Sequence, residues 1–150
     1  LDKGVVPSDW KKATVCPIFK KGEKYDPVNY RPVSLTSVAC KVLEHIITSH
    51  LMTYAENQNL LHPNQHGFCK NKSCEKQLIE LISDLTSNMD DCIQMEACIL
   101  DFSKAFDKVS HRKLLGKLAS YGISHQLVAW IDSFLTNRVQ TVVVDGRESR

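Results

Sequence analysis

A long helical pattern of apolar residues between positions 38 and 54 places the strongest limit on how this chain folds. The apolar positions recur every three or four residues, as they do along one face of a helix of about five turns. They are Val38, Val42, Leu43, Ile46, Ile47, Leu51 and Tyr54. Ser37 precedes them as an N-cap. Such a helix needs a partner for its apolar face, and the rest of the chain has to supply it.

Strand-like segments lie on both sides of this helix. Residues 14–19 and 30–35 predict two extended segments, joined by the turn-forming sequence "KKGEKYDP". Pro17 and Pro32 indicate edge or irregular strands, because proline cannot donate a backbone hydrogen bond to a neighbouring strand. The C-terminal "RVQTVVVDG" predicts a strand that ends in an Asp-Gly turn.

Three further helices follow from the pattern. One begins near Ser73 and places Leu78, Ile79, Leu81, Ile82 and Leu85 inward. Another is "DKVSHRKLLGKLASYG", closed by Gly122. A last helix, "SHQLVAWIDSFLTN", is capped by Ser124. The order of elements predicts an α+β fold in which helices pack on a sheet.

Composition agrees with one folded domain. The chain has 150 residues, of which 43% are hydrophobic and 24% charged. No apolar run approaches the roughly 20 residues of a membrane helix, so we expect an intracellular protein, in the nucleus or the cytoplasm, without a membrane partner. The chain opens on Leu1 and closes in a strand-like segment. We therefore expect a fragment of a longer protein.

The charges are uneven along the chain. Residues 1–76 carry 11 Lys and Arg against 7 Asp and Glu, a balance of +4, and residues 77–150 carry 8 against 10, a balance of −2. This asymmetry suits a polyanion held by the first half, and ordinary scatter of surface charge explains the same counts equally well.

The six cysteines form no C-x-x-C pair and are expected to be reduced thiols. His62, His66, Cys69 and Cys74 lie within thirteen residues, which raises the question of zinc. Zinc modules usually bring two ligands together on each side of a longer loop. The spacing here is different, so no zinc is expected.

Asp101 closes the apolar segment "CIQMEACILD", which predicts a short strand buried in a sheet. A carboxylate at the end of such a strand is well placed to bind Mg²⁺, which prefers oxygen ligands. The alternative is that Asp101 begins a turn or caps a helix, and spacing alone favours this alternative. Asp107, six residues later, is expected to be the N-cap of a helix starting near Lys108.

Three segments together identify a family. "LDFSKAFDKVSH" resembles the first palm motif of reverse transcriptases of non-LTR (LINE-like) retrotransposons. "NYRPVSLTSVACKVLEHII" resembles the fingers motif of the same family, and "NQHGFCKNKSCEKQL" resembles the segment that follows it. The three occur in the family's order, and the similarity covers essentially the whole chain.

The resemblance implies a right-hand polymerase fold that is incomplete. Residues 1–90 would be the fingers region, and residues 91–150 the start of the palm. The family's Pro-Gln-Gly segment and its Asp-Asp hairpin are absent before Arg150. The implied activity is RNA-directed DNA synthesis, with an RNA template, a DNA primer and deoxynucleotides as partners. Because the second catalytic carboxylate lies in the absent hairpin, this chain alone is expected to be inactive.

The resemblance also implies roles for the palm residues. Asp101 would be the catalytic carboxylate that binds two Mg²⁺ ions in the complete domain, for nucleotidyl transfer to the primer 3′-hydroxyl. The backbone carbonyl of Phe102 would be a further metal ligand. Phe106 would lie under the sugar of the incoming nucleotide and exclude a 2′-hydroxyl, which favours deoxynucleotides.

In the fingers region, Lys20 and Arg31 match the two cations that hold the incoming triphosphate. Four residues match the segment that approaches the template: Gln65, Gly67, Phe68 and Lys70. Gly67 suits a close backbone approach or a positive φ angle. Cys69 departs from the pattern, because many relatives have Arg there.

Two alternatives remain beside a part of a polymerase that is active only in a longer chain. One is an inactive remnant of a retroelement that still binds nucleic acid through its basic fingers. The other is a reverse transcriptase of the group II intron maturase class, which shares these motifs broadly. The wording of "NYRPVSLTS" and "SKAFDKVSH" fits the non-LTR elements better.

Overall fold

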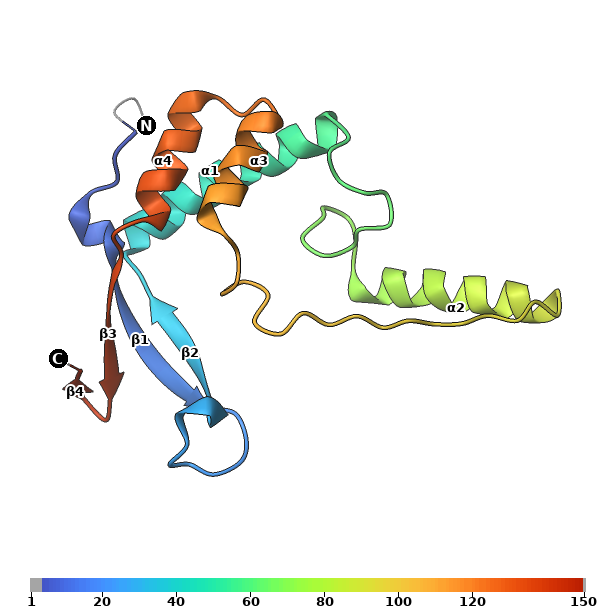
Figure 1. The fold of residues 1–150 in the computed structure, drawn as a ribbon, viewed down its shortest axis with the longest axis horizontal. Helices are drawn as coiled ribbons and strands as arrows, with labels where there is room; N and C mark the ends of the chain where they lie inside the picture. The colour runs from blue at the N-terminus through green and yellow to red at the C-terminus, as the bar shows by residue number, and fades with distance from the viewer. Residues whose placement is uncertain (1–3, 150) are drawn as a thin grey trace. The chain divides into compact units, whose positions relative to one another are not determined.

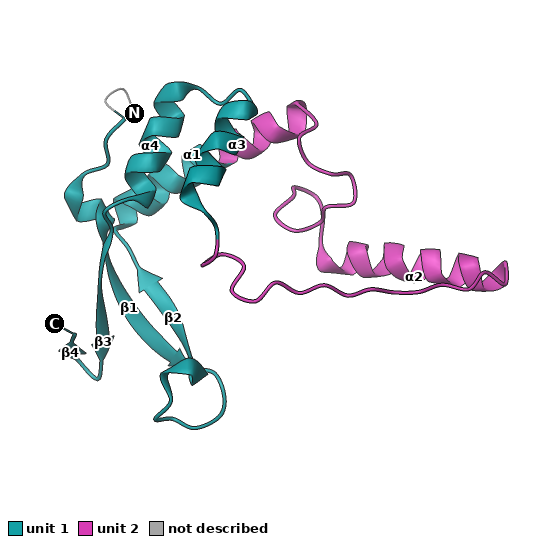
Figure 2. Ribbon diagram, in the orientation of Figure 1, with its two compact units in different colours: residues 1–48, 109–150 teal, residues 49–108 magenta. Residues whose placement is uncertain are grey.

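The computed structural model describes residues 4–149. The chain divides into two compact units, shown in different colours in Figure 2. Unit 1 comprises residues 1–48 and 109–150, and unit 2 comprises residues 49–108. The two units are defined by the contacts within each of them and do not test the expected boundary near residue 90 between fingers and palm. That boundary stays a prediction.

Unit 1 contains a sheet of four strands in the order β2-β1-β3-β4 (Figure 1). The strands are β1 (Lys12–Phe19), β2 (Tyr30–Leu35), β3 (Val139–Val144) and β4 (Arg147–Glu148). β1 pairs antiparallel with β2 and parallel with β3, while β3 and β4 form an antiparallel hairpin. The two short 3-10 helices are η1 (Ser8–Lys11) and η2 (Pro27–Asn29).

The predicted strands at residues 14–19 and 30–35 are confirmed as β1 and β2, and the predicted C-terminal strand is confirmed as β3. Pro32 lies in β2, an edge strand of the sheet. Pro17 lies in the central strand β1, but the β1–β3 ladder pairs only residues 12–15 of β1. At Pro17 the sheet is therefore a two-stranded ribbon, and the missing N–H costs no ladder bond to β3. The Asp145-Gly146 turn joins β3 to β4 with both φ angles positive, 49° and 75°.

The helices of unit 1 begin and end where capping residues stand. α3 (His111–Ser120) starts after Ser110, and α4 (His125–Leu135) starts after Ser124. At the end of α3, Gly122 has φ +80° and its N–H bonds to the Ala119 carbonyl, while the Ile123 N–H bonds to that of Leu118. This is a Schellman motif, so the helix end predicted at Gly122 is confirmed. The predicted Asp107 cap is wrong, because Ser110 caps the helix three residues later.

The core of unit 1 takes its buried side chains from the N-terminal segment, β1, α1 and α4. Its buried apolar side chains are Val6, Val15, Cys40, Ile47 and Trp130. The Trp130 ring stacks on Phe134 with centroids 5.4 Å apart, and the Val6 N–H donates to the Ser133 hydroxyl at 3.1 Å. The N-terminal segment is thereby attached to α4.

The long helix α1 (Val38–Asn57) begins directly after Ser37, as predicted, and runs from unit 1 into unit 2. Its apolar face is only partly covered. Ile47 is buried, but Val42 and Ile46 are exposed, and the most deeply buried residue is Cys40, which the periodicity did not single out. The prediction of one continuous inward face is therefore wrong for this helix.

Unit 2 contains α2 (Cys74–Asp90), whose predicted start is confirmed. The Ser73 hydroxyl accepts a hydrogen bond from the Lys76 N–H at 3.2 Å. A separate hydrogen bond from the Ser73 side chain to the Glu75 carboxylate, together with one from the Glu75 backbone, lowers the pKa of Glu75. The predicted burial is wrong: Leu78, Ile79, Leu81 and Ile82 are all exposed. A helix can form from its local sequence and its cap without a partner for its apolar face.

The segment 92–101, for which the sequence predicts a buried strand, is neither a strand nor buried. It runs as an extended chain after α2 without a ladder partner, and Ile99 is 93% exposed and Leu100 79%. A strand needs a neighbour for its N–H and C=O groups, and an apolar composition does not provide one. The prediction that Asp101 closes a buried strand is therefore wrong for the described residues.

The mixed α/β content of four helices and one sheet of four strands in residues 4–149 agrees with the predicted α+β class. None of the described helices is both long enough and apolar enough to cross a membrane. The intracellular location stays a prediction.

Candidate functional site

Lys20 and Arg31 lie on one face of the β1–β2 hairpin. Arg31 stands opposite Ile18, and the Lys20 N–H continues the ladder with a 2.8 Å bond to the Asn29 carbonyl. Side chains alternate along a strand, so Lys20 is on the same face as Ile18 and Arg31. Diagonal neighbours of this kind lie roughly 7–8 Å apart, with their Cβ atoms somewhat closer. Both cations are exposed, and together they offer two positive charges to an anion on that face.

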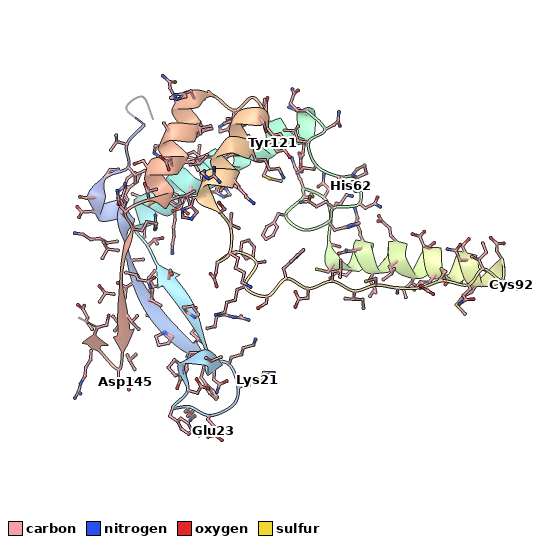
Figure 3. The ribbon with its side chains drawn as sticks, viewed as in Figure 1. Lys21, Glu23, His62, Cys92, Tyr121 and Asp145 are labelled. Carbon is pink, nitrogen blue, oxygen red and sulfur yellow. The ribbon has the colours of Figure 1, made fainter. Side chains whose placement is uncertain are left out.

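The loop between the two strands is held by its own hydrogen bonds. The Asn29 amide donates to the Glu23 carbonyl at 3.0 Å, and the Tyr30 hydroxyl donates to the Lys24 carbonyl at 2.6 Å. Gly22 has φ +89°, and a Cβ there would lie 2.7 Å from the Asn29 amide nitrogen. Lys21 and Glu23 are labelled on this loop in Figure 3. Because the loop is tied down, Lys20 and Arg31 have a defined spacing.

Phe19 and Tyr30 occupy the opposite face of the hairpin. Their rings meet edge to face with centroids 5.5 Å apart, and the Lys24 ammonium lies 6.0 Å from the Phe19 centroid. The hairpin therefore carries Lys20 and Arg31 on one face, called the cationic face, and the two aromatic rings with Lys24 beside them on the other.

Asp101 and Phe102 lie in the exposed extended segment of unit 2. The Phe102 side chain is 80% exposed. Within the described residues, no three His, Cys, Asp or Glu side chains are grouped closely enough to hold a metal ion. Asp101 can supply one carboxylate, but the described residues do not by themselves make a two-ion site. The metal role of Asp101 and of the Phe102 carbonyl stays a prediction.

The loop 62–72 of unit 2 carries the four predicted template residues. It contains a turn, closed by the Cys69 N–H bonding to the His66 carbonyl at 3.3 Å. The Gln65 amide donates to the Gly67 carbonyl at 3.2 Å. The positive φ angle expected at Gly67 belongs instead to Phe68, at 62°. The positive φ is therefore wrong for Gly67, and the alternative, a close backbone approach, stays a prediction. Gly67 takes the second place of the turn and Phe68 the third, where type II turns have positive φ.

His66 is a residue of this loop to which the sequence assigned no structural role. It is 7% exposed, the one buried polar residue among those described. Its Nδ1 lies 3.1 Å from the Asn64 carbonyl, and its Nε2 lies 3.1 Å from Glu80 Oε2 on α2, without the alignment of a hydrogen bond. No local pattern links a loop histidine to a helix residue fourteen positions later, so sequence reasoning had no signal for this contact.

The structure brings two predicted site residues of unit 2 into contact. The Phe68 ring meets the Phe106 ring edge to face, with centroids 6.2 Å apart and an interplanar angle of 89°. In unit 1, the hairpin register places Lys20 and Arg31 on the same face.

Comparison with known proteins finds a family for nearly the whole chain. Residues 18–150 match the family model described as "Reverse transcriptase (RNA-dependent DNA polymerase)". The chain is 33% identical over 150 residues to the "RNA-directed DNA polymerase from mobile element jockey" of Drosophila melanogaster, covering 99% of this chain and 16% of that protein.

Two further relatives show the same relation. The "Retrovirus-related Pol polyprotein from type-1 retrotransposable element R2" of Popillia japonica is 28% identical, covering 100% of this chain and 21% of that protein. The "Probable RNA-directed DNA polymerase from transposon BS" of Drosophila melanogaster is 32% identical, covering 75% of this chain and 12% of that protein. The chain thus spans a small part of these relatives. The predicted resemblance to reverse transcriptases of non-LTR retrotransposons is confirmed, and the chain belongs to the reverse transcriptase (RNA-dependent DNA polymerase) family.

Proposed function

We propose that this chain is part of an RNA-directed DNA polymerase that adds deoxynucleotides to a primer 3′-hydroxyl on an RNA template. The observation that carries the proposal is the family match over residues 18–150. The names of the mobile-element relatives support it over the intron maturase alternative. In a right-hand polymerase, residues 1–90 would belong to the fingers and residues 91–150 to the start of the palm.

The palm residues of this proposal are Asp101 and Phe102. Asp101 supplies one carboxylate, and Phe102 its backbone carbonyl, to divalent ions for which Mg²⁺ is the expected metal. Bound in pairs, such ions activate the attacking hydroxyl and stabilise the leaving pyrophosphate. The exposure of Asp101 leaves its carboxylate accessible to a metal and to substrate.

Replacing Asp101 tests this role directly. In the longest reading frame that contains these 150 residues, Asp101→Ala should reduce incorporation of labelled deoxynucleotide on a primed RNA template to background. Binding of the template, measured by gel shift, should stay nearly unchanged. Asp107→Ala is the matched control, six residues away and also exposed, and should retain synthesis. Full activity of Asp101→Ala would refute the assignment, and synthesis by the 150-residue chain alone would refute its expected inactivity.

An inactive remnant is the competing interpretation. It would show a salt-sensitive gel shift, because binding to phosphates releases counterions, but no synthesis by the unmutated long reading frame. The same two measurements therefore separate a working polymerase from a remnant.

The cationic face of the hairpin would hold the nucleotide triphosphate. Arg31 provides a bidentate fork and Lys20 a point charge, and both neutralise phosphate oxygens. Arg31→Ala should raise the KM for deoxynucleotides about tenfold or more, the effect of losing one or two charge-assisted hydrogen bonds. Lys21→Ala, in the loop beyond the strands, is the control and should change the KM less than Arg31→Ala. Equal effects of both variants would reduce the role of Arg31 to general positive charge.

Phe106 would act as the filter against ribonucleotides. Its ring is 80% exposed and so is available to contact a sugar. Phe106→Ala should admit ribonucleotides in a primer-extension assay, because the space that excludes a 2′-hydroxyl is opened. If this variant still excludes them, Phe106 is not the filter.

The template would approach the loop at Gln65, Gly67, Phe68 and Lys70. A Cβ added at Gly67 would meet no protein atom within 4 Å, and its φ is not positive. Gly67→Ala should therefore leave the fold intact and weaken binding of a primed template if the template backbone passes close to this residue. Unchanged template affinity would argue against close approach there.

A further inference from the structure

The contact between Phe68 and Phe106 joins two segments that lie 38 positions apart in the chain. Both rings are largely exposed, Phe68 at 84% and Phe106 at 80%. Burial in a core therefore does not explain why they meet. Their edge-to-face geometry, with centroids 6.2 Å apart, is one that aromatic pairs favour.

Phe68 reaches this position through an unusual backbone conformation. Its φ of 62° lies in the left-handed region, which is uncommon for a bulky residue. Gly67 stands next to it and does not take that conformation. Backbone outliers of this kind persist where the surroundings hold them and tend to occur at functional sites. The turn thus directs an aromatic ring, and not a glycine, towards Phe106.

The loop that carries Phe68 is tied to its surroundings at several points. The Lys72 ammonium donates to the Pro63 carbonyl, which closes the loop on itself. The Lys76 ammonium on α2 donates to the Asn71 carbonyl at 2.8 Å. His66 is buried beside Glu80 of α2, with 3.1 Å between Nε2 and Oε2. Phe68 is therefore mounted on a loop that is anchored to α2.

Phe106 lies in a segment that is neither helix nor strand. It follows Lys104, which has φ 53°, in a run of turns between residues 103 and 108. The Lys108 N–H bonds to the Lys104 carbonyl at 3.1 Å within this run of turns. The ring of Phe106 can thus take its orientation from a partner outside its own segment.

We propose that Phe68 is a positioning residue that sets the place of the Phe106 ring and thereby the discrimination between deoxynucleotides and ribonucleotides. The inference rests on the proposed role of Phe106 as the sugar filter. A steric filter excludes a hydroxyl only if its ring cannot move aside, and an edge-to-face partner on an anchored loop restricts that movement. Phe68 touches Phe106 and acts through it, so it needs no contact with the nucleotide.

The kinetic test uses the longest reading frame that contains the chain and measures kcat/KM for a deoxynucleotide and for its ribonucleotide. Phe68→Ala should lower the ratio of the two values about tenfold or more by raising the ribonucleotide value, with little change for the deoxynucleotide. Phe68→Tyr keeps the ring and should restore the original ratio. Met89→Ala, an exposed residue near the end of α2, is the control and should leave both values unchanged.

The double variant Phe68→Ala/Phe106→Ala separates coupled from independent effects. If Phe68 acts through Phe106, the double variant discriminates no worse than Phe106→Ala alone. Phe68→Ala that weakens both nucleotides equally, or that changes only template affinity, overturns the inference and leaves Phe68 as a template contact. If Phe106→Ala itself does not change the ratio, the proposed filter has failed, and that failure is distinguishable from failure of Phe68.

A second measurement needs no catalysis. In the 150-residue chain with 4-fluorophenylalanine at position 106, fluorine NMR reports the surroundings of that ring. Phe68→Ala should shift the resonance, while Phe68→Tyr and Met89→Ala should not. An unchanged resonance in Phe68→Ala overturns the inference even if the polymerase proves inactive.

Discussion

Unit 1 and unit 2 have similar apolar patterns but bury very different parts of them. In unit 1, the buried apolar side chains come from the N-terminal segment, β1, α1 and α4. In unit 2, the one buried side chain among those described is polar, that of His66, although α2 and residues 93–102 are rich in apolar residues.

The difference shows that local sequence signals can form a helix, whereas a buried core also requires contacts between distant segments. Strand pairing and helix packing bring distant segments of unit 1 together, since β1 has neighbours on both sides and α3 packs on α4. Unit 2 has a capped helix and an extended segment without a sheet. An exposed apolar stripe of this size often marks a surface that a further protein element covers. The same residue types thus contribute a core in one unit and an open surface in the other.

The largest test of this contrast replaces an aromatic residue in each unit. Trp130→Ala removes a side chain that is 4% exposed and stacked on Phe134, and should lower the free energy of unfolding by about 3–5 kcal/mol. Phe102→Ala removes one that is 80% exposed, and should change it by less than about 0.5 kcal/mol. Urea unfolding followed by circular dichroism, with hydrogen exchange of β1 amides, measures both. Similar decreases in the free energy of unfolding for the two variants would show that unit 2 has a core.

The reactivity of one cysteine in each unit provides a second test of the difference in burial. Burial, reinforced by the Glu44 carboxylate 3.1 Å from the sulfur, raises the pKa of the Cys40 thiol to about 11 from 9.0. Its thiolate fraction at pH 8 is then about a hundredfold lower than that of an ordinary cysteine. Mass spectrometry after iodoacetamide treatment should find Cys92, which is exposed in unit 2, alkylated far sooner than Cys40. Equal rates would mean that unit 1 opens readily around α1.

The same thiol predicts how stability depends on pH. Because the folded-state pKa is the higher one, the protonated thiol favours the folded state, and this contribution is fully present below pH 9. It declines as the pH rises from about 9 towards 11, where the thiol ionises in the folded protein as well. Cys40→Ala should make the decline shallower, and Cys92→Ala should not. Unfolding curves measured from pH 8 to 11 compare the two variants.

The smallest expected effect concerns the cap of α2. Ser73→Ala removes the hydrogen bond from the Lys76 N–H, and caps of this kind stabilise a helix by about 1 kcal/mol. Because the apolar face of α2 is exposed, little packing compensates, and the helical signal in circular dichroism should fall. Ser83→Ala, within the same helix, is the control and should leave the signal unchanged or raise it slightly. If Ser83→Ala lowers the helical signal and Ser73→Ala does not, the Ser73 cap is not the reason why α2 starts there.

Much of the fold could be predicted where the signal is local. Four features follow from residues within a few positions of each. They are the β1–β2 hairpin, the Asp145-Gly146 turn, the end of α3 at Gly122 and the start of α4 after Ser124. The shift of the α3 start from Asp107 to Ser110 is a competition between two caps of similar strength. Local chemistry offers both, and only the surrounding chain selects one.

The candidate site divides in the same way. The spacing of Lys20 and Arg31 on one face follows from strand alternation once the hairpin register is known. The contact of Phe68 with Phe106 and the burial of His66 beside Glu80 depend on how a loop folds against distant segments. No period or motif in the sequence reports such contacts.

The sequence by itself determined the family, the four helices, the β1–β2 hairpin and the turn that ends β3, because motifs, caps and turns act over a few residues. Only the tertiary structure decided that β1 pairs with the distant β3, that Cys40 is the most deeply buried residue, and that residues 93–102 do not form a strand. The physical reason is that burial and ladder hydrogen bonds require a partner. An apolar residue favours contact with other apolar surface, but which segment provides that surface depends on the whole arrangement of the chain.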